Sequence, residues 1–373
     1  MSGRYLPQDD SAYLSRQLIT CLGNKRALLP QIEEIVCDVR DGLGGRKLRC
    51  GDLFSGSGVV ARLLKRHSEL LCVNDLEHYS AVVNACYLTN REDFPRAQFA
   101  EAFARAEERL SRPLEAGLIA AHYAPADDRS IKPGERVFYT GENARIIDTL
   151  RAFIDTVDGD LRPYFLAPLL SQASVHSNTG GVFKGFYKDS ATGVGKFGGN
   201  GENALSRILG KIELQRPLLS RFSCESRVFR QDANALAGAL PELDLVYLDP
   251  PYNQHPYGSN YFMLNVIAEN ALSGELSRVS GIPAGWNRSD YNKQAKAPAA
   301  LAALIRDVPA RYVLISYNSE GFILPEQMEE MLAPLGQVEK TAIDYNVYRA
   351  SRNLSGRGTH VTEYLYLLRK EML

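Results

Sequence analysis

Four consecutive residues, Asp249, Pro250, Pro251 and Tyr252, directly follow the apolar run LDLVYL and carry the sharpest chemical signal in the sequence. Two prolines can neither extend a central strand nor donate backbone hydrogen bonds, so they predict a stiff turn with free carbonyl groups. Such a turn presents two fixed acceptors, the Asp249 carboxylate and the Pro250 carbonyl, beside an aromatic ring. The alternative is a proline-rich turn that the aspartate merely caps.

Paired acceptors of this kind suit chemistry at an exocyclic amino group of a nucleobase. The nitrogen of such a group is conjugated with the ring and is a poor nucleophile. Two acceptors that hold its N–H groups favour a tetrahedral nitrogen with an available lone pair. Tyr252 would stack on a base that has left the duplex, and stacking offsets the unpairing cost at ~1–3 kcal/mol per base.

A second signal is the glycine-rich stretch DLFSGSGVVARLL at 52–64. Gly56 and Gly58 allow a tight turn and a close approach to a ligand, and the following helix points its positive end there. Asp75, at the end of the next predicted strand, is placed to bind ribose hydroxyls. A nicotinamide-binding turn or a plain strand-to-helix turn would look similar.

Asp52 distinguishes between the possible ligands of this turn. A carboxylate at this strand end would repel the pyrophosphate of a nicotinamide cofactor. A sulfonium with an amino-acid tail suits it better, so S-adenosylmethionine (SAM) is favoured over NAD. The alternative for Asp52 is a helix cap.

The elements around these motifs alternate between strand and helix patterns, which predicts parallel βαβ units. We expect an α/β fold of the SAM-dependent methyltransferase Rossmann-like type, mostly parallel, with a terminal antiparallel hairpin from 337–351 and 360–370. Three blocks are predicted: 1–88 and 223–373 as the core, and 89–222 as an inserted region. The insertion should be mostly helical, with helices over 96–110 and 142–155 and a flexible or hairpin segment.

The composition is that of a globular protein: 373 residues, 45% hydrophobic, 23% charged and a net charge of -1. The six cysteines lack metal-ligand spacing, so we expect buried free thiols, no metal and a reducing, cytoplasmic compartment. No apolar run is long enough for a membrane span, and the start does not read as a signal peptide.

Together the motifs resemble the adenine-specific DNA methyltransferases of the Dam-like alpha group, which includes modification methylases of restriction systems. CLGNKRALLPQIEEI at 21–35 is similar to that group's N-terminal SAM-contacting segment, followed in order by DLFSGSGVVARLL, Asp75 and the DPPY turn. SNTGGVFKGFYK at 177–188 resembles the segment beside the recognition region. The matching stretches cover about 150 residues.

The resemblance implies methyl transfer from SAM to the adenine amino nitrogen in DNA. It assigns catalysis to the turn and SAM binding to a further set: Asn24, Lys25, Asp52, Phe54, Gly56, Gly58, Asp75 and Asp232. Lys25 and Asp52 would contact the methionine end, and Asp232 the adenine ring. A surface lysine and a helix cap are the alternatives for Lys25 and Asp232. Neither His255 nor His360 is assigned a catalytic role.

Double-stranded DNA would need local positive charge. The segment 181–230 holds nine basic and four acidic residues, a net +5 in a nearly neutral chain. We therefore expect Lys184 and Lys188 to contact DNA, with Arg349 and Arg352 in a second basic loop. An ordinary solvated face is the alternative, and the second loop could simply link two strands.

Competing functions are an RNA adenine methyltransferase, a cytosine amino-group DNA methyltransferase, and a nicotinamide-binding or inactive module. The size of the insertion favours sequence-specific recognition of DNA over an RNA substrate. An aspartate at the first position of the turn favours adenine over cytosine as the target base. The resemblance also implies a cognate restriction endonuclease as a partner. The sequence does not determine the oligomeric state or the recognition sequence.

Overall fold

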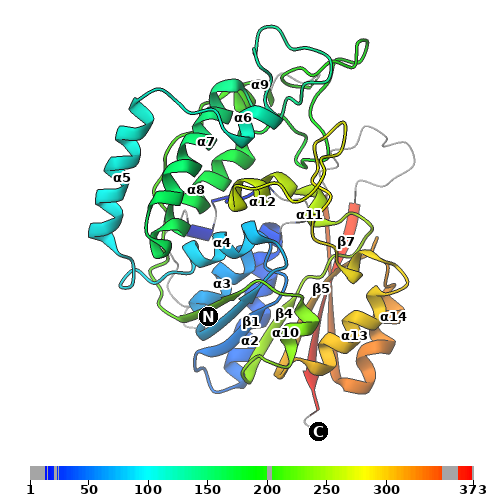
Figure 1. The fold of residues 1–373 in the computed structure, drawn as a ribbon. Helices are drawn as coiled ribbons and strands as arrows, with labels where there is room; N and C mark the ends of the chain where they lie inside the picture. Colours follow the sequence, from blue (N-terminus) through cyan, green and yellow to red (C-terminus); the bar gives the residue numbers. More distant parts are fainter. Residues whose placement is uncertain are drawn as a thin grey trace.

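The computed structural model describes residues 13–14, 16–20, 23, 25–199, 204–346 and 360–371. Three residues with expected roles, Asn24, Arg349 and Arg352, lie outside this part of the chain. A mostly parallel sheet forms one half of the molecule, and a layer of helices lies over the edge where its strands end (Figure 1).

The sheet has seven strands in the order β3-β2-β1-β4-β5-β7-β6. The five strands from β3 to β5 are parallel, whereas β7 runs antiparallel to both β5 and β6. The strands are β1 Leu48–Asp52, β2 Ser68–Asn74, β3 Glu225–Phe229, β4 Leu243–Leu248, β5 Ala310–Asn318, β6 Gly336–Asn346 and β7 His360–Lys370. The predicted parallel sheet and its terminal antiparallel hairpin are confirmed.

The central strand β4 is almost wholly apolar because both faces of the sheet are covered. Leu245 and Tyr247 point toward one cluster, with helices α2 and α3, while Val246 and Leu248 point toward another, with α10, α13 and α14. These helices are α2 Leu29–Gly42, α3 Val59–His67, α10 Ala233–Ala237, α13 Ala297–Asp307 and α14 Pro325–Leu332. The short helices η1 Lys25–Leu28 and η4 Asp290–Asn292 precede α2 and α13 in the chain, and η5 Ala333–Leu335 follows α14.

The helical layer has its own core, in which α8 packs against α4, α7 and α12. Its helices are α4 His78–Tyr87, α5 Arg96–Ser111, α6 Leu118–Tyr123, α7 Gly141–Thr156, η2 Gly159–Leu161, α8 Arg162–Val175, α9 Leu205–Leu209, α11 Tyr257–Asn260 and α12 Phe262–Glu269. Helices α4 and α12 belong to this core although they lie outside the insertion predicted at 89–222. The domain boundaries at 89 and 222 therefore stay a prediction.

The helices predicted over 96–110 and 142–155 are confirmed as α5 and α7. The glycine-rich segment contains one isolated antiparallel bridge, between Lys188 and Gly195. Helix α8 was not predicted, because it is buried on nearly every side and has no amphipathic period to detect.

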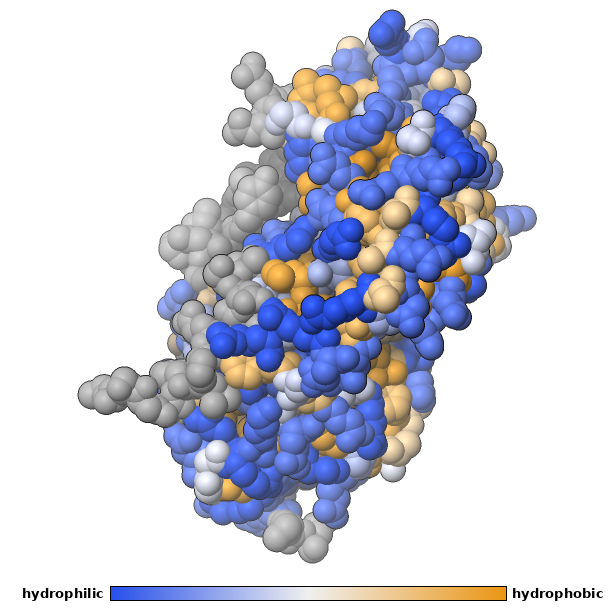
Figure 2. Space-filling view, turned by 90° about the vertical axis from the view of Figure 1, so that its left-hand side faces the viewer, coloured by the Kyte–Doolittle hydropathy of each residue, from blue (hydrophilic) through white to orange (hydrophobic). Residues whose placement is uncertain are grey.

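The face on the side of α5 is mostly hydrophilic, with separate hydrophobic patches between polar side chains (Figure 2). No helix in the described ranges is long and apolar enough to cross a membrane. The five cysteines in the described part of the chain, Cys37, Cys50, Cys72, Cys86 and Cys224, are buried and in thiol form.

Candidate active site

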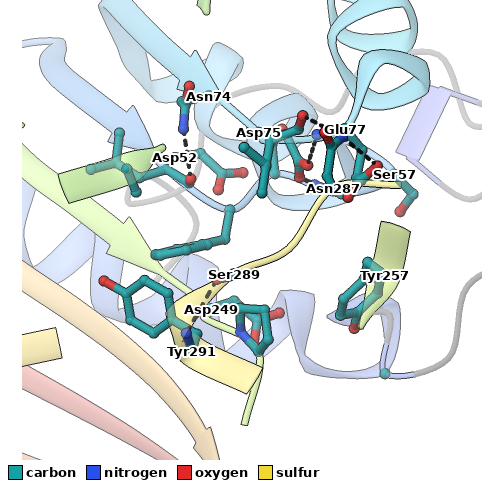
Figure 3. Close-up of a pocket in the computed structure, with 18 of the residues that line it drawn as sticks. Asp52, Ser57, Asn74, Asp75, Glu77, Asp249, Tyr257, Asn287, Ser289 and Tyr291 are labelled. Carbon is teal, nitrogen blue, oxygen red and sulfur yellow. Dashed lines mark hydrogen bonds between the residues drawn. The ribbon is translucent and has the colours of Figure 1, made fainter. Parts of the chain in front are cut away.

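A cleft of about 950 Å³, counted with its open mouth, lies where β1, β2 and β4 end. Ligands of open α/β sheets bind at this edge, in the crevice where the parallel strands end. Side chains from the three strand ends and from the 287–292 segment surround the space (Figure 3). The lining includes eight residues expected from the sequence: Lys25, Asp52, Phe54, Gly56, Asp75, Asp232, Asp249 and Pro251.

The turn after β1 depends on its glycines. Gly56 and Gly58 have φ angles of 53° and 72°, a region that other residues rarely adopt. A Cβ atom on Gly58 would also lie 2.5 Å from Oδ1 of Asn84. The Asn84 amide braces the turn by donating to Ser55 Oγ over 2.8 Å. The backbone is thereby held close to the cleft, with α3 starting directly behind it.

Asp52 ends β1 and is only 1% exposed. Within the described residues, neither of its carboxylate oxygens has a hydrogen-bond partner of good geometry. Burial, followed by the nearby charges of Asp249 and Asp75, raises its pKa well above the usual value, while the N–H groups of Phe54 and Ala61 act in the opposite direction. An unpaired buried carboxylate beside a cleft favours a positively charged ligand.

Asp75 ties the end of β2 to the glycine turn. Its carboxylate accepts hydrogen bonds from the backbone N–H of Gly56 at 2.7 Å and from that of Glu77 at 2.8 Å. Burial raises the pKa of Asp75, and these N–H donors counteract part of that rise. The side chain is therefore held in one orientation at the cleft wall.

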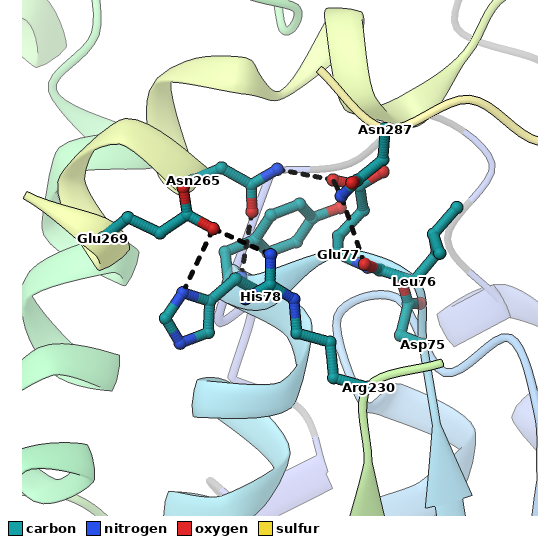
Figure 4. A network of polar contacts seen from close by, with 9 residues as sticks. Asp75, Leu76, Glu77, His78, Arg230, Asn265, Glu269 and Asn287 are labelled. Atoms are coloured by element: carbon teal, nitrogen blue, oxygen red, sulfur yellow. Dashed lines mark hydrogen bonds and ion pairs between the residues drawn. The ribbon is translucent and has the colours of Figure 1, made fainter. Parts of the chain in front are cut away.

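Glu77, which sequence reasoning missed, connects three parts of the molecule (Figure 4). Asn265 of α12 donates to its Oε2, and Asn287 donates to the same oxygen over 3.0 Å. Burial and the charge of Asp75 raise the pKa of Glu77 to about 7. This network attaches the helical layer and the 287–292 segment to the sheet edge.

The turn after β4 brings the second aspartate to the cleft. Lys25 Nζ lies 3.0 Å from Oδ1 of Asp249 and 2.9 Å from Oε1 of Glu363 on β7. Glu363 also accepts from Ser316 Oγ at 2.5 Å and from Asn318 Nδ2 at 3.2 Å. Asp249 thus has a cationic partner within the protein, whereas Asp52 has none among the described residues.

The pKa values of this group follow from burial and mutual charge. Burial raises the pKa of Asp249 to about 6, with Lys25 lowering it and Glu363 raising it. For Lys25, burial alone would lower the pKa, but Asp249 and Glu363 hold it well above the usual value. At neutral pH the pair is therefore ionised.

Two tyrosines flank the turn. The backbone carbonyl of Tyr252 accepts from Phe322 N at 3.0 Å, and its ring meets Tyr317 edge-on at 6.4 Å between centroids. Tyr257 lines the cleft and stacks on Tyr261 at 5.6 Å. Tyr257 was not predicted, although its place five residues after Tyr252 in an aromatic-rich stretch was the available signal.

The far wall comes from α10 and the 287–292 segment. Asp232 caps α10 by accepting from the N–H groups of Asn234 and Ala235, and it also lines the cleft. Phe54 meets Tyr291 edge-on at 5.0 Å. Asn287, Ser289, Tyr291 and Asn292 complete this wall.

Residues 183–188 of the basic segment lie close to the stretch that follows the turn at 249–252 but do not line the cleft. The backbone N–H of Phe183 donates to Asn260 O at 2.7 Å, which joins this segment to α11. Lys184 and Lys188 are exposed, and Lys188 Nζ lies 5.0 Å from the Phe186 ring centroid. Burial, and then the charge of Lys184, lowers the pKa of His255, as expected for neighbours.

Residues 22–279 match the family of D12 class N6 adenine-specific DNA methyltransferases. The chain is 30% identical to the Type II methyltransferase M.NlaIII of Neisseria lactamica over 94% of its own length and 98% of that protein. It is 28% identical to the Type II methyltransferase M.CviAII of Paramecium bursaria Chlorella virus 1, covering 85% and 89% of the two chains. It is also 27% identical to the modification methylase StsI of Streptococcus sanguinis, of which it spans 52%.

The chain therefore belongs to the D12 class, and it is an adenine-specific DNA methyltransferase of the restriction-modification type. The comparisons give no support to an RNA adenine or a cytosine methyltransferase.

Proposed function

We propose that SAM binds in the cleft and donates its methyl group to the amino nitrogen of an adenine that has been flipped out of double-stranded DNA. The observation that carries this proposal is the contrast between two buried aspartates at one cleft, of which only Asp52 lacks a partner of good geometry. A cationic donor would fit beside Asp52, and a neutral amine beside Asp249.

The residues that line the cleft suit the chemical groups of SAM. Asp52 would face the positively charged methionine end, together with the start of α3 and Gly56. Asp75 would accept from the ribose hydroxyls, and Phe54 and Asp232 would lie beside the adenine ring. Gly58 shapes the turn, and Asn24 would belong to the same segment as Lys25. SAM supplies an electrophilic methyl group on a sulfonium.

The DPPY turn would act on the target adenine. The Asp249 carboxylate and the Pro250 carbonyl accept from the two N–H bonds of the amino group, Pro251 keeps the turn rigid, and Tyr252 stacks on the base. The nitrogen lone pair forms the new N–C bond, the S–C bond breaks with its electron pair on sulfur, and the nitrogen then releases a proton to solvent. No strong general base is needed.

DNA would lie across the exposed basic segment and the mouth of the cleft. Lys184 and Lys188 would contact phosphates, because they are exposed and their segment is bonded to α11 beside the turn. We assign Arg349 and Arg352 to a second phosphate contact and region 89–222 to target recognition. The relatives' names support a cognate restriction endonuclease as partner. The buried thiols support a reducing, cytoplasmic location.

The test is transfer of label from methyl-labelled SAM to defined DNA and RNA duplexes, with the product base identified by mass spectrometry. We expect N6-methyladenine in DNA, and no transfer by D249A although that variant still binds SAM in calorimetry. Label in RNA alone, label on cytosine, or a fully active D249A would contradict the proposal.

A further inference from the structure

Glu363 lies on β7, far along the chain from both motifs of the site, yet it contacts the catalytic group. Its position follows from the topology. Because β7 runs antiparallel between β5 and β6, its first residues lie at the edge where the parallel strands end, and Glu363 pairs with Asn318 at the end of β5. The side chain is fully buried.

A buried glutamate in this position is not explained by stability alone, since a buried ion pair seldom stabilises more than apolar packing would. Glu363 is instead held by an ammonium group and two neutral donors: Lys25 Nζ at 2.9 Å, Ser316 Oγ at 2.5 Å and Asn318 Nδ2 at 3.2 Å. These contacts aim it at Lys25, which also binds Asp249.

We infer that Glu363 is a positioning residue for methyl transfer: it shares the Lys25 ammonium with Asp249 and so leaves the Asp249 carboxylate able to accept a hydrogen bond from the adenine amino group. This inference rests on the proposed function of Asp249. With Glu363 present, one ammonium serves two carboxylates, and the group keeps a net negative charge. That charge also favours the positive charge that passes to the amino nitrogen during transfer.

Without Glu363, Lys25 would be committed to Asp249 alone. The resulting neutral pair would hold the adenine amino group less strongly, since part of the carboxylate's hydrogen-bonding capacity would be spent on the ammonium. The groups that face Asp249 from the surrounding elements are Lys25, Glu363, Asp52, and the hydroxyls of Tyr247 and Tyr257. Of these, only Glu363 and Asp249 form ion pairs with Lys25 in the described residues.

The test compares wild type with E363Q, which keeps the shape of the side chain and removes its charge. We expect kcat for DNA methylation to fall by about 10–100-fold, while the SAM dissociation constant measured by calorimetry changes less than threefold. The acid limb of the kcat–pH profile should move to lower pH by about one unit, because the negative charge of Glu363 raises the pKa of Asp249.

E339Q is the matched control, because Glu339 is an exposed glutamate on the neighbouring strand β6. It should keep the wild-type rate and pH profile. Thermal unfolding of each variant is measured in parallel. If E363Q alone is too unstable, K25M is compared with the K25M/E363Q double variant: since Glu363 acts through Lys25, the two should differ little in rate.

An E363Q enzyme with a wild-type rate and an unmoved acid limb would overturn the inference, as would a K25M/E363Q enzyme that is about tenfold or more slower than K25M. Loss of methylation in D249A alongside either result would leave the proposed function standing. A fully active D249A would overturn the proposed function and, with it, the role of Glu363.

Discussion

The two central strands, β1 and β4, each deliver an aspartate to the same cleft, but the two carboxylates have opposite surroundings. Asp52 is buried without a hydrogen-bond partner of good geometry among the described residues, while Asp249 is bound to the Lys25 ammonium. The difference indicates a division of labour. Under the proposed function, a cationic ligand would complete the β1 end, whereas the β4 end carries its own cation and would receive a neutral amine.

The largest effect that would sharpen this comparison is expected from D52N. Replacing the carboxylate with a neutral amide removes the charge that faces the cationic ligand, so SAM affinity should fall by roughly 10–100-fold. Calorimetric titration with SAM checks this. D249N provides the counterpart, because it should retain SAM affinity and lose transfer. Equal SAM affinity in D52N and wild type would break the proposed division.

The next effect concerns pH. Burial raises the pKa of Asp249 to about 6, and in the proposed mechanism Asp249 is ionised when it accepts from the amino group. The transfer rate at saturating SAM and DNA should therefore be at its plateau above pH 7 and fall about tenfold for each unit well below 6. Single-turnover rates between pH 5 and 8 measure this limb. A flat profile across that range would exclude the titration of Asp249 as the controlling event.

A smaller effect is expected outside the cleft, at the basic segment. The double reversal K184E/K188E should weaken DNA binding by roughly tenfold and flatten the dependence of log K on log salt by about two units. Fluorescence anisotropy at several salt concentrations gives both quantities. K47E is the control, since Lys47 is exposed just before β1, at the opposite edge of the sheet. Matching slopes for K184E/K188E and wild type would remove these lysines from the interface.

The smallest effect is on stability. Because burial raises the folded-state pKa of Asp52 above its unfolded value, its contribution to stability is fully present below about pH 4 and is lost as pH rises toward the folded value. At pH 8 without SAM, the free energy of unfolding of D52N, measured by denaturant titration, should therefore exceed that of wild type by roughly 1–3 kcal/mol. Near pH 3 the two should be equal. A D52N protein less stable at pH 8 would show that Asp52 is satisfied in some other way.

Several elements were predictable because their signals are local. The run LDLVYL predicted a strand buried on both faces, and β4 is such a strand. The glycines predicted a tight turn, and both have positive φ angles there. Helix α8 was not predictable, because a helix buried on nearly all sides shows no polar face. Glu363 was missed for a different reason, since no local pattern reports which strand will be inserted beside β5.

The sequence by itself determined the chemistry that each segment can offer: a stiff acceptor turn at Asp249, a tight turn at Gly56 and Gly58, and a group of lysines in a glycine-rich segment. These properties depend on backbone freedom, side-chain type and neighbours within a few residues. Only the tertiary structure decided which charges are compensated. Lys25, Asp249 and Glu363 come from η1, the end of β4 and β7, and their ion pairs exist because sheet order and strand direction bring three distant segments to one edge.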